Sequence, residues 1–243
     1  MKSTDFKAQA PCLTARMIQG SEWSVLSLEE IQIFNENVNC RSYDVGETIF
    51  YEEDDCKGLY LVKSGLIKIK KIDKEGRQVL MRLAHPGDTL GYRPFLAGEQ
   101  HRSGAEAIET ARVCFLPKVI VRQILISNPE LGAGFLQRTA RALGAADERF
   151  FETVTLPARV RLIHLLMTLR ERCGHIVEDG SLYLELPLTR GDIASMLGIR
   201  AESLSRLISE IQAEDLAHFS GNKIKIANPK LLLEKLDAGL GSL

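Results

Sequence analysis

The spacing of hydrophobic and polar positions changes along the chain, and each change predicts a different kind of element. Between about residues 40 and 117, short β-type runs are separated by glycines at regular intervals. In the run Leu66–Lys70, Ile67 and Ile69 alternate with lysines, which is the period of two expected for a half-buried strand. Evenly spaced short strands with glycine turns predict an antiparallel barrel or jelly roll.

A different period begins near Asn128 and continues to about Thr155. Apolar residues recur there every seven positions, and small residues follow each of them by three. This pattern is typical of a seam between two identical helices. Its members are Leu136, Thr139, Leu143, Ala146, Phe150 and Thr153. Leu131 and Phe135 lie off the seam, and we expect them to pack on the barrel. The alternative interpretation is a core helix within one chain.

Start and stop signals divide the rest of the chain. Ser27, with Glu30 three residues later, can cap a helix over residues 28–37. Pro157 ends the long helix, and an amphipathic stretch follows over 158–172. The predicted fold class is α+β. Its parts are a loose N-terminal arm (1–27), a β-roll sensor domain (28–127), a dimerisation helix (128–155) and a C-terminal winged helix-turn-helix (156–243).

The C-terminal part contains the most specific local pattern, Leu188–Ile208. Thr189 and Asp192 form a capping-box pattern for a first short helix, and Gly198 supplies a turn. Apolar residues at three- and four-residue spacing anchor a second helix: Leu204, Leu207, Ile208 and Ile211. A β segment over 217–226, which turns at Gly221-Asn222, then predicts a wing.

The second helix has a polar face suited to base edges in the major groove. Arg206 can bind the O6 and N7 atoms of guanine, Glu202 can accept a hydrogen bond from the cytosine amino group, and Ser205 can do either. Alternatively, Glu202 and Arg206 form an ordinary i,i+4 ion pair. The candidate phosphate contacts, whose alternative is solvated surface, are Thr189, Arg190, Arg200, Lys223 and Lys225.

Composition alone does not predict DNA binding. The 243 residues are 45% hydrophobic and 26% charged, with a formal net charge of −1. Residues 156–243 hold eleven Lys and Arg against eleven Asp and Glu. Phosphate affinity must therefore come from the placement of individual charges. No apolar run approaches the ~20 residues that span a bilayer.

The five cysteines are scattered and never form a C-x-x-C pair. In a chain without a signal peptide, this favours a reducing compartment, a cytoplasmic location and no disulfide framework.

The order of glycine-rich β-roll, long helix and winged helix-turn-helix resembles the CRP/FNR superfamily of bacterial transcription regulators over residues 28–235. The run Leu186–Ile193 and the Glu202-x-x-Ser205-Arg206 pattern are very similar to the FNR branch. The CRP branch has an arginine where this chain has Ala201. The resemblance implies a homodimer on a palindrome with TTGAT-like half-sites that contacts RNA polymerase.

The β-roll and the N-terminal arm differ from both the CRP branch and the FNR branch at the residues that bind an effector. Tyr92 stands where cAMP-binding relatives have the glutamate that holds the ribose, although Arg102-Ser103 match their phosphate-binding pair. The resemblance therefore places effector-pocket candidates at Tyr92, Arg93, Arg102 and Ser103, and the departure disfavours cAMP. An FNR-type iron–sulfur cluster needs four thiolates. Cys114 matches its β-roll ligand, but the arm offers only Cys12, which disfavours such a cluster.

Two interpretations of the input signal stay open. One is a thiol switch between Cys12 and Cys114, against the alternative that Cys114 is a core residue. The other is haem, with His85 or His101 as the axial ligand, against the alternative of an ordinary turn or surface histidine.

The overall hypothesis is a non-catalytic, homodimeric DNA-binding regulator controlled by an unidentified redox, gas or small-molecule signal. A cyclic-nucleotide-binding regulatory module is the alternative. No nucleophile–base pair, metal-ligand cluster or P-loop points to an enzyme.

Overall fold

The computed structural model describes residues 12–13, 18 and 20–232. The chain forms two compact units, residues 1–144 and 145–243. Helix α5 (Pro129–Thr155) contributes residues to both units. Each unit has its own sheet structure and its own buried residues, and the two are described separately.

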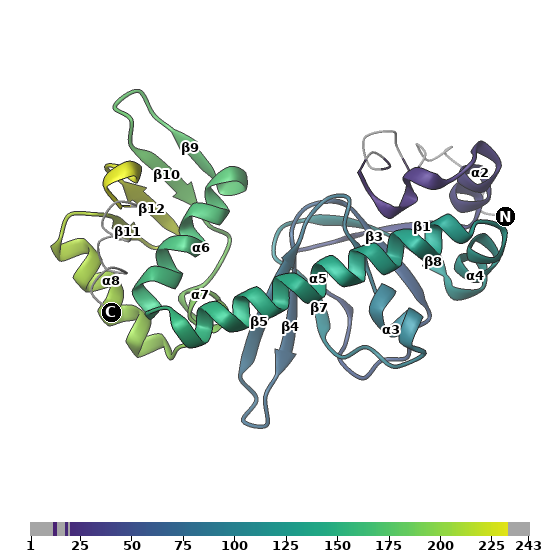
Figure 1. Cartoon of the computed structure of the whole chain (residues 1–243), viewed down its shortest axis with the longest axis horizontal. Helices are drawn as coiled ribbons and strands as arrows, with labels where there is room; N and C mark the ends of the chain where they lie inside the picture. Colours follow the sequence, from purple (N-terminus) through teal and green to yellow (C-terminus); the bar gives the residue numbers. More distant parts are fainter. Residues whose placement is uncertain (1–11, 14–17, 19, 233–243) are drawn as a thin grey trace, which may run out of the picture. The chain divides into compact units, whose positions relative to one another are not determined.

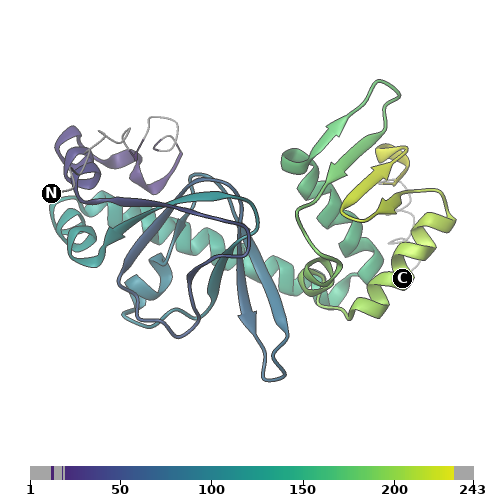
Figure 2. The ribbon, with the colours of Figure 1, turned by 180° about the vertical axis from the view of Figure 1, so that it is seen from behind.

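The first unit is built on eight antiparallel strands in two four-stranded sheets (Figures 1 and 2). One sheet has the order β1-β8-β3-β6, and the other has the order β2-β7-β4-β5. The predicted β-roll and the α+β fold class are confirmed. The strands are β1 (Asn39–Tyr43), β2 (Thr48–Phe50), β3 (Gly58–Ser64), β4 (Ile67–Ile72), β5 (Gln78–Ala84), β6 (Thr89–Leu90), β7 (Gly104–Ala107) and β8 (Ala111–Pro117).

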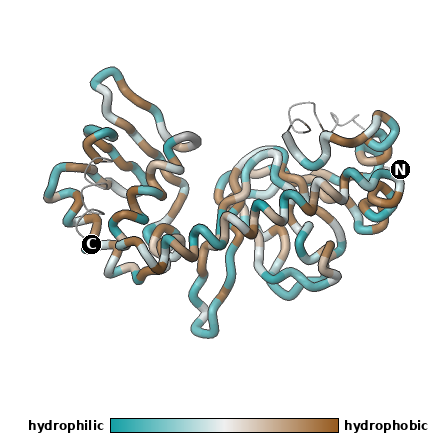
Figure 3. The backbone as a smooth tube through the Cα atoms, viewed as in Figure 1, coloured by the Kyte–Doolittle hydropathy of each residue, from teal (hydrophilic) through white to brown (hydrophobic). Residues whose placement is uncertain are grey.

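Strand β4 keeps the predicted alternation, with Ile67 and Ile69 buried inside the roll. Its lysine face is less open to solvent than the pattern suggests. Lys68 and Lys70 both bind the carboxylate of Glu106 on β7, and their side chains are only 13% and 12% exposed. The tip of the β4–β5 hairpin, by contrast, is hydrophilic (Figure 3).

Helices cover one face of the β1-β8-β3-β6 sheet. They are η1 (Glu22–Val25), α2 (Leu28–Asn37), α3 (Tyr92–Ala97), α4 (Lys118–Ser127) and the first turns of α5. The predicted capping box of α2 is present: the Ser27 amide donates to Glu30 Oε2 (2.9 Å), and the Glu30 amide donates to Ser27 Oγ (3.2 Å). Leu131 and Phe135 of α5 are fully buried in this core, as predicted.

The N-terminal arm is not loose where the structure describes it, which corrects the sequence-based expectation. Cys12 and Leu13 are each 3% exposed and lie in the same core. Both backbone amides donate to Oδ1 of Asn35 on α2, at 3.0 and 3.2 Å. Two apolar residues form too short a run to show a period, so the sequence does not reveal their burial.

The second unit begins after Gly144 of α5 and has a four-stranded antiparallel sheet of order β11-β12-β10-β9. Its elements are α6 (Ala158–Cys173), β9 (Gly174–Ile176), β10 (Leu182–Glu185), α7 (Arg190–Met196), α8 (Ala201–Ala213), β11 (His218–Ser220) and β12 (Lys223–Ile226). The predicted wing is the β11–β12 hairpin, and its turn contains Gly221 at φ +60°.

The core of the first unit can be tested on α4, where two isoleucines two residues apart differ in burial. Ile124 is 1% exposed and Ile126 is 83% exposed. Ile124→Ala should lower the free energy of unfolding by about 2–5 kcal/mol, because it removes buried methyl groups and leaves a cavity. Urea denaturation followed through Trp23, the single tryptophan and itself buried in this core, measures the change. The control Ile126→Ala should stay within about 0.5 kcal/mol of wild type; equal losses in both variants would contradict this packing.

Candidate functional site: a helix-turn-helix and a three-cysteine cluster

Helix α8 has one anchored face and one open face. Leu204, Ile208 and Ile211 are buried, while Leu207, also predicted to anchor the helix, is half-buried. The three residues of the predicted polar face, Glu202, Ser205 and Arg206, are exposed, and so is Ser209 one turn further along. This spacing directs the polar side chains away from the core of the second unit.

The helix before α8 is fixed at its start and at its end. The Asp192 amide donates to Thr189 Oγ1 (3.1 Å), and the Thr189 amide donates to Asp192 Oδ2 (2.9 Å), which forms the predicted capping box. Gly198 follows α7 with φ +65°, a left-handed conformation that favours glycine. The turn between α7 and α8 therefore has the backbone chemistry that the sequence predicted.

The open face of α8 is free of internal ion pairs. Among the described residues, no hydrogen bond or ion pair joins the side chains of Glu202 and Arg206, so the surface ion-pair alternative has no support in this conformation. Both groups can therefore bind a ligand without first breaking a contact within the protein.

The candidate phosphate contacts have different surroundings. Arg190 lies over the Phe219 ring at 5.3 Å, Lys223 pairs with Glu185 at 3.8 Å, and Arg200 is the exposed residue before α8. Lys225 pairs with Asp179 at 3.8 Å. Thr189 uses both its amide and its hydroxyl on Asp192, so a phosphate contact there would compete with the cap.

The four effector-pocket candidates differ in exposure and in partners. Tyr92 is 4% exposed, and its hydroxyl accepts a hydrogen bond from Arg93 Nε at 3.3 Å. The Arg102 side chain is 80% exposed and makes a two-pronged ion pair with Glu99, at 2.7 and 3.0 Å. Hydrogen bonding to Glu99 raises the pKa of Arg102. Ser103, the fourth candidate, is half-buried beside it.

The two haem-ligand candidates also differ. His101 is 3% exposed and stacks on Phe50 with ring centroids 3.9 Å apart. Its Nε2 atom is buried without a hydrogen-bond partner in the described part of the chain. Burial lowers the pKa of His101, which favours the neutral ring. His85 is half-buried, and its backbone amide donates to Asp88 at 2.9 Å.

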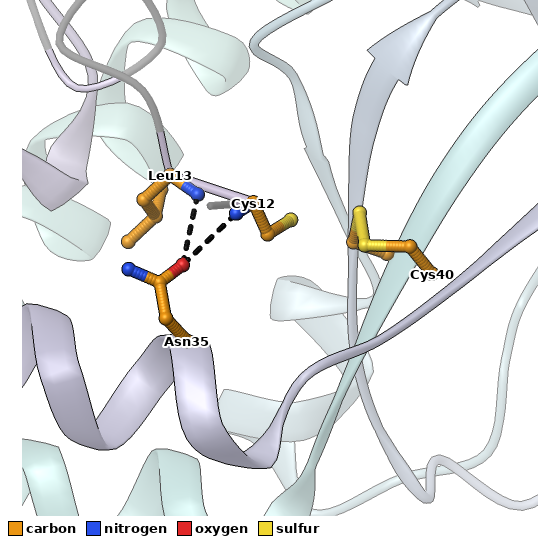
Figure 4. The surroundings of a disulfide bond; sticks show 5 residues. Cys12, Leu13, Asn35 and Cys40 are labelled. Carbon is orange, nitrogen blue, oxygen red and sulfur yellow. Dashed lines mark hydrogen bonds between the residues drawn. A yellow bond between two sulfur atoms is a disulfide. The ribbon is translucent and has the colours of Figure 1, made fainter. Parts of the chain in front are cut away.

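Three cysteines meet on the helix-covered face of the β1-β8-β3-β6 sheet. Cys40 on β1 lies directly opposite Cys114 on β8, and the two form a disulfide. The Cys12 side chain points toward this disulfide (Figure 4), and all three sulfur atoms lie within 4.8 Å of one another. Burial raises the pKa of the Cys12 thiol to about 11, although Lys63 and Arg112 act in the opposite direction.

This cluster corrects two expectations from the sequence. We expected no disulfide, but strand register brings together two cysteines 74 positions apart in sequence. We also expected no cluster of metal ligands, but the described residues contain one group that could hold an ion. Cys12 and Cys114, the two predicted redox candidates, are indeed neighbours. Sequence reasoning missed Cys40, since only the β1–β8 register reveals it.

A four-thiolate iron–sulfur cluster does not fit this site. Of the two remaining cysteines, Cys56 has its sulfur 3.5 Å from the carbonyl oxygens of Gly58 and of Gly91, and either can accept its one thiol hydrogen. Cys173 belongs to the second unit. The chain has five cysteines in all, so the site offers three thiolates where such a cluster needs four.

The predicted seam on α5 is open to solvent in the single chain. Leu136, Leu143 and Phe150 are 69%, 62% and 72% exposed. Thr139 is half-buried, while Ala146 and Thr153 are exposed. Large apolar side chains repeated along one helix face indicate an interaction surface.

Comparisons with known proteins match both units. Residues 40–128 match the cyclic nucleotide-binding domain family, and residues 160–235 match the Crp-like helix-turn-helix domain family. No described helix is long and apolar enough to cross a membrane.

The chain is similar to bacterial regulators over most of its length. It is 29% identical over 189 residues to the fumarate and nitrate reduction regulatory protein of Vibrio cholerae, covering 78% of this chain and 75% of that protein. It is 29% identical over 183 residues to electron transport regulator A of Shewanella oneidensis, covering 75% and 72%. The structure of FixK2 from Bradyrhizobium japonicum superimposes with a TM-score of 0.68 at 25% identity, covering 81% of this chain and 96% of that one.

Proposed function

This chain belongs to the CRP/FNR family of transcription regulators, and from that premise we propose that it acts as a homodimer on a palindrome with TTGAT-type half-sites. The observation that carries the proposal is the open polar face of α8. Glu202, Ser205 and Arg206 are exposed there above a buried apolar face. In this proposal the three side chains read base edges, and the dimer contacts RNA polymerase.

The phosphate-contacting residues would position α8 without specifying sequence. Arg190, Arg200, Lys223 and Lys225 are the candidates best placed to do so, since each carries a positive charge on or beside the helix-turn-helix or the wing. Thr189 would contribute mainly by holding the start of α7.

Dimerisation would use the exposed face of α5. Its six members lie at heptad spacing, and Leu136, Leu143 and Phe150 present large apolar surfaces. Pairing two such helices removes this surface from water and gives the two-fold symmetry that a palindrome requires. No charged residue occupies the seam, so we expect pairing without an effector.

The proposed signal acts through the first unit and is redox in nature. Support comes from the disulfide between Cys40 and Cys114, with the Cys12 thiol beside it. Against a cyclic nucleotide, Tyr92 stands where the resemblance expects the ribose-binding glutamate and is buried, and Arg102 is paired with Glu99. His101 Nε2 is buried, so haem could reach it only if the packing around this side chain opened.

The base-reading role can be tested with Arg206→Ala. Loss of a forked contact to guanine should weaken binding to a TTGAT palindrome by about 1–3 kcal/mol, or roughly 5- to 150-fold. It should also relax the preference at one base pair. Mobility-shift titrations against the palindrome and its single-base variants measure both effects. Arg122→Ala, which removes an exposed arginine from helix α4, is the matched control and should leave affinity unchanged. Unchanged affinity in Arg206→Ala would rule out the assigned role.

The seam can be tested with Leu143→Glu, which would place two like charges together at the helix pair. Light scattering at micromolar concentration should give a dimer for wild type, twice 27.1 kDa, and a monomer for the variant. Ala145→Glu adds the same charge at an exposed position off the seam and should stay dimeric. A monomeric wild type, or two variants that behave alike, would refute the seam.

Redox control predicts that DNA affinity depends on the Cys40–Cys114 bond. Oxidised and dithiol-reduced wild type should differ by about 5- to 150-fold in affinity for the palindrome, the usual range of coupling between two sites. The double variant Cys12→Ser/Cys40→Ser can form neither this bond nor a substitute bond between Cys12 and Cys114, so its affinity should be the same under both conditions. Equal affinities for the two forms of wild type would argue against this signal.

A further inference from the structure

The three sulfurs of the cysteine cluster lie close enough to surround a single ion. They are within 4.8 Å of one another. Sulfurs bound to one ion at about 2.3 Å lie about 3.8–4.0 Å apart, depending on whether the geometry is tetrahedral or trigonal. Reduction of the disulfide would free the Cys40 and Cys114 sulfurs to separate by that distance, with Cys12 already beside them.

The fold holds the three donors from separate elements. Cys40 and Cys114 are directly opposed on β1 and β8. Cys12 comes from the N-terminal segment, where Oδ1 of Asn35 accepts hydrogen bonds from the amides of Cys12 and Leu13 (Figure 4). Asn35 is thus a positioning residue for the third sulfur.

Burial at this site disfavours a free thiolate, so the thiolate charge needs a bound cation to offset it. Cys12 and Cys114 are buried, and Cys40 is half-buried. The positive charges of Lys63 and Arg112 act on Cys12, and Arg112 Nε is buried without a hydrogen-bond partner in the described residues. Three thiolates with Cu⁺ carry a charge of −2, and with Zn²⁺ a charge of −1. Two nearby cations offset either charge.

From this geometry we propose that Cys12, Cys40 and Cys114, once reduced, bind one thiophilic d¹⁰ metal ion, Cu⁺ or Zn²⁺. Thiolates select such soft ions. A dithiol reductant supplies two electrons and two protons to the Cys40–Cys114 bond and itself becomes a disulfide. The three thiols then bind the ion and release three protons. The disulfide and the metal are mutually exclusive, because the same two sulfurs take part in both.

The test uses the full chain and needs no DNA, so its outcome is independent of the proposed regulator function. Wild type is reduced with a dithiol, desalted anaerobically and titrated with Cu⁺ or with Zn²⁺, each against a chromophoric chelator. The reduced protein should take up one equivalent of at least one ion, and the arm that succeeds identifies it. The oxidised protein, which has the same sequence and needs no substitution, should take up none at this site. Equal uptake by both forms, or uptake by neither, overturns the proposal.

Variants locate the site. Cys12→Ala should abolish stoichiometric uptake, while Cys56→Ser, at a buried cysteine outside the group, should bind as wild type does. Asn35→Ala keeps all three sulfurs and should weaken binding by about 10- to 100-fold, as loss of an orienting contact usually does. Trp23 fluorescence checks that each variant is folded. Equal losses in Cys12→Ala and Cys56→Ser would refute the assignment.

A third experiment distinguishes a single bound ion from an iron–sulfur cluster. Reconstitution of the reduced protein with ferrous iron and sulfide should leave the visible spectrum bare. Stable iron–sulfur absorption after desalting would overturn the mononuclear site.

Discussion

The first unit depends on how helix α5 is seated against the β-roll. Trp23 packs edge-on against Phe34 and Phe135, with ring centroids 5.1 and 5.5 Å apart, and its indole N–H donates to Thr89 Oγ1 at 2.9 Å. One turn along α5, Arg138 binds Glu22 and Asp88 at 2.9 and 2.7 Å. Coulombic attraction to these two carboxylates outweighs desolvation and raises the pKa of Arg138. Burial of apolar side chains and the ion pairs of Arg138 together fix which side of the helix faces the roll.

Seating one side of α5 determines what its other side can do. Leu131 and Phe135 are buried and Arg138 binds carboxylates on the same side of the helix, while Leu136 and Leu143, on another side, are left in water. Two sets of apolar residues interleaved on one helix thus have separate uses. The first belongs to the fold of the single chain, and the second is available for a partner.

The caps and the turn of the helix-turn-helix could be predicted from the sequence because each depends on residues close together in the chain. The caps at Ser27 and Thr189 involve residues three apart, and the turn at Gly198 needs only one backbone conformation. The cysteine cluster depends instead on the pairing of β1 with β8 and on the hydrogen bond that the Cys12 amide donates to Asn35 Oδ1, and neither leaves a periodic signal. The three sulfurs come from positions 12, 40 and 114, so distance along the chain hides them.

Because the three sulfurs lie so close together, the cluster can take either of two states, a disulfide or a bound ion. Cys114 can be joined to Cys40 or can share an ion with Cys40 and Cys12, but it cannot do both. Each state also ties the N-terminal segment to the roll differently, because only the ion includes Cys12. The same residues that pack the core therefore carry its chemistry.

The equal numbers of acidic and basic residues over 156–243 do not by themselves set how strongly the protein attaches to DNA. Non-specific attachment to DNA comes from counterions released at each phosphate that a Lys or Arg contacts, so it depends on how many cations meet the backbone and not on the net charge of the domain. In the proposed complex, attachment to arbitrary sequence would therefore depend on the few cations beside α8 and on the wing, and it would weaken steeply as the salt concentration rises.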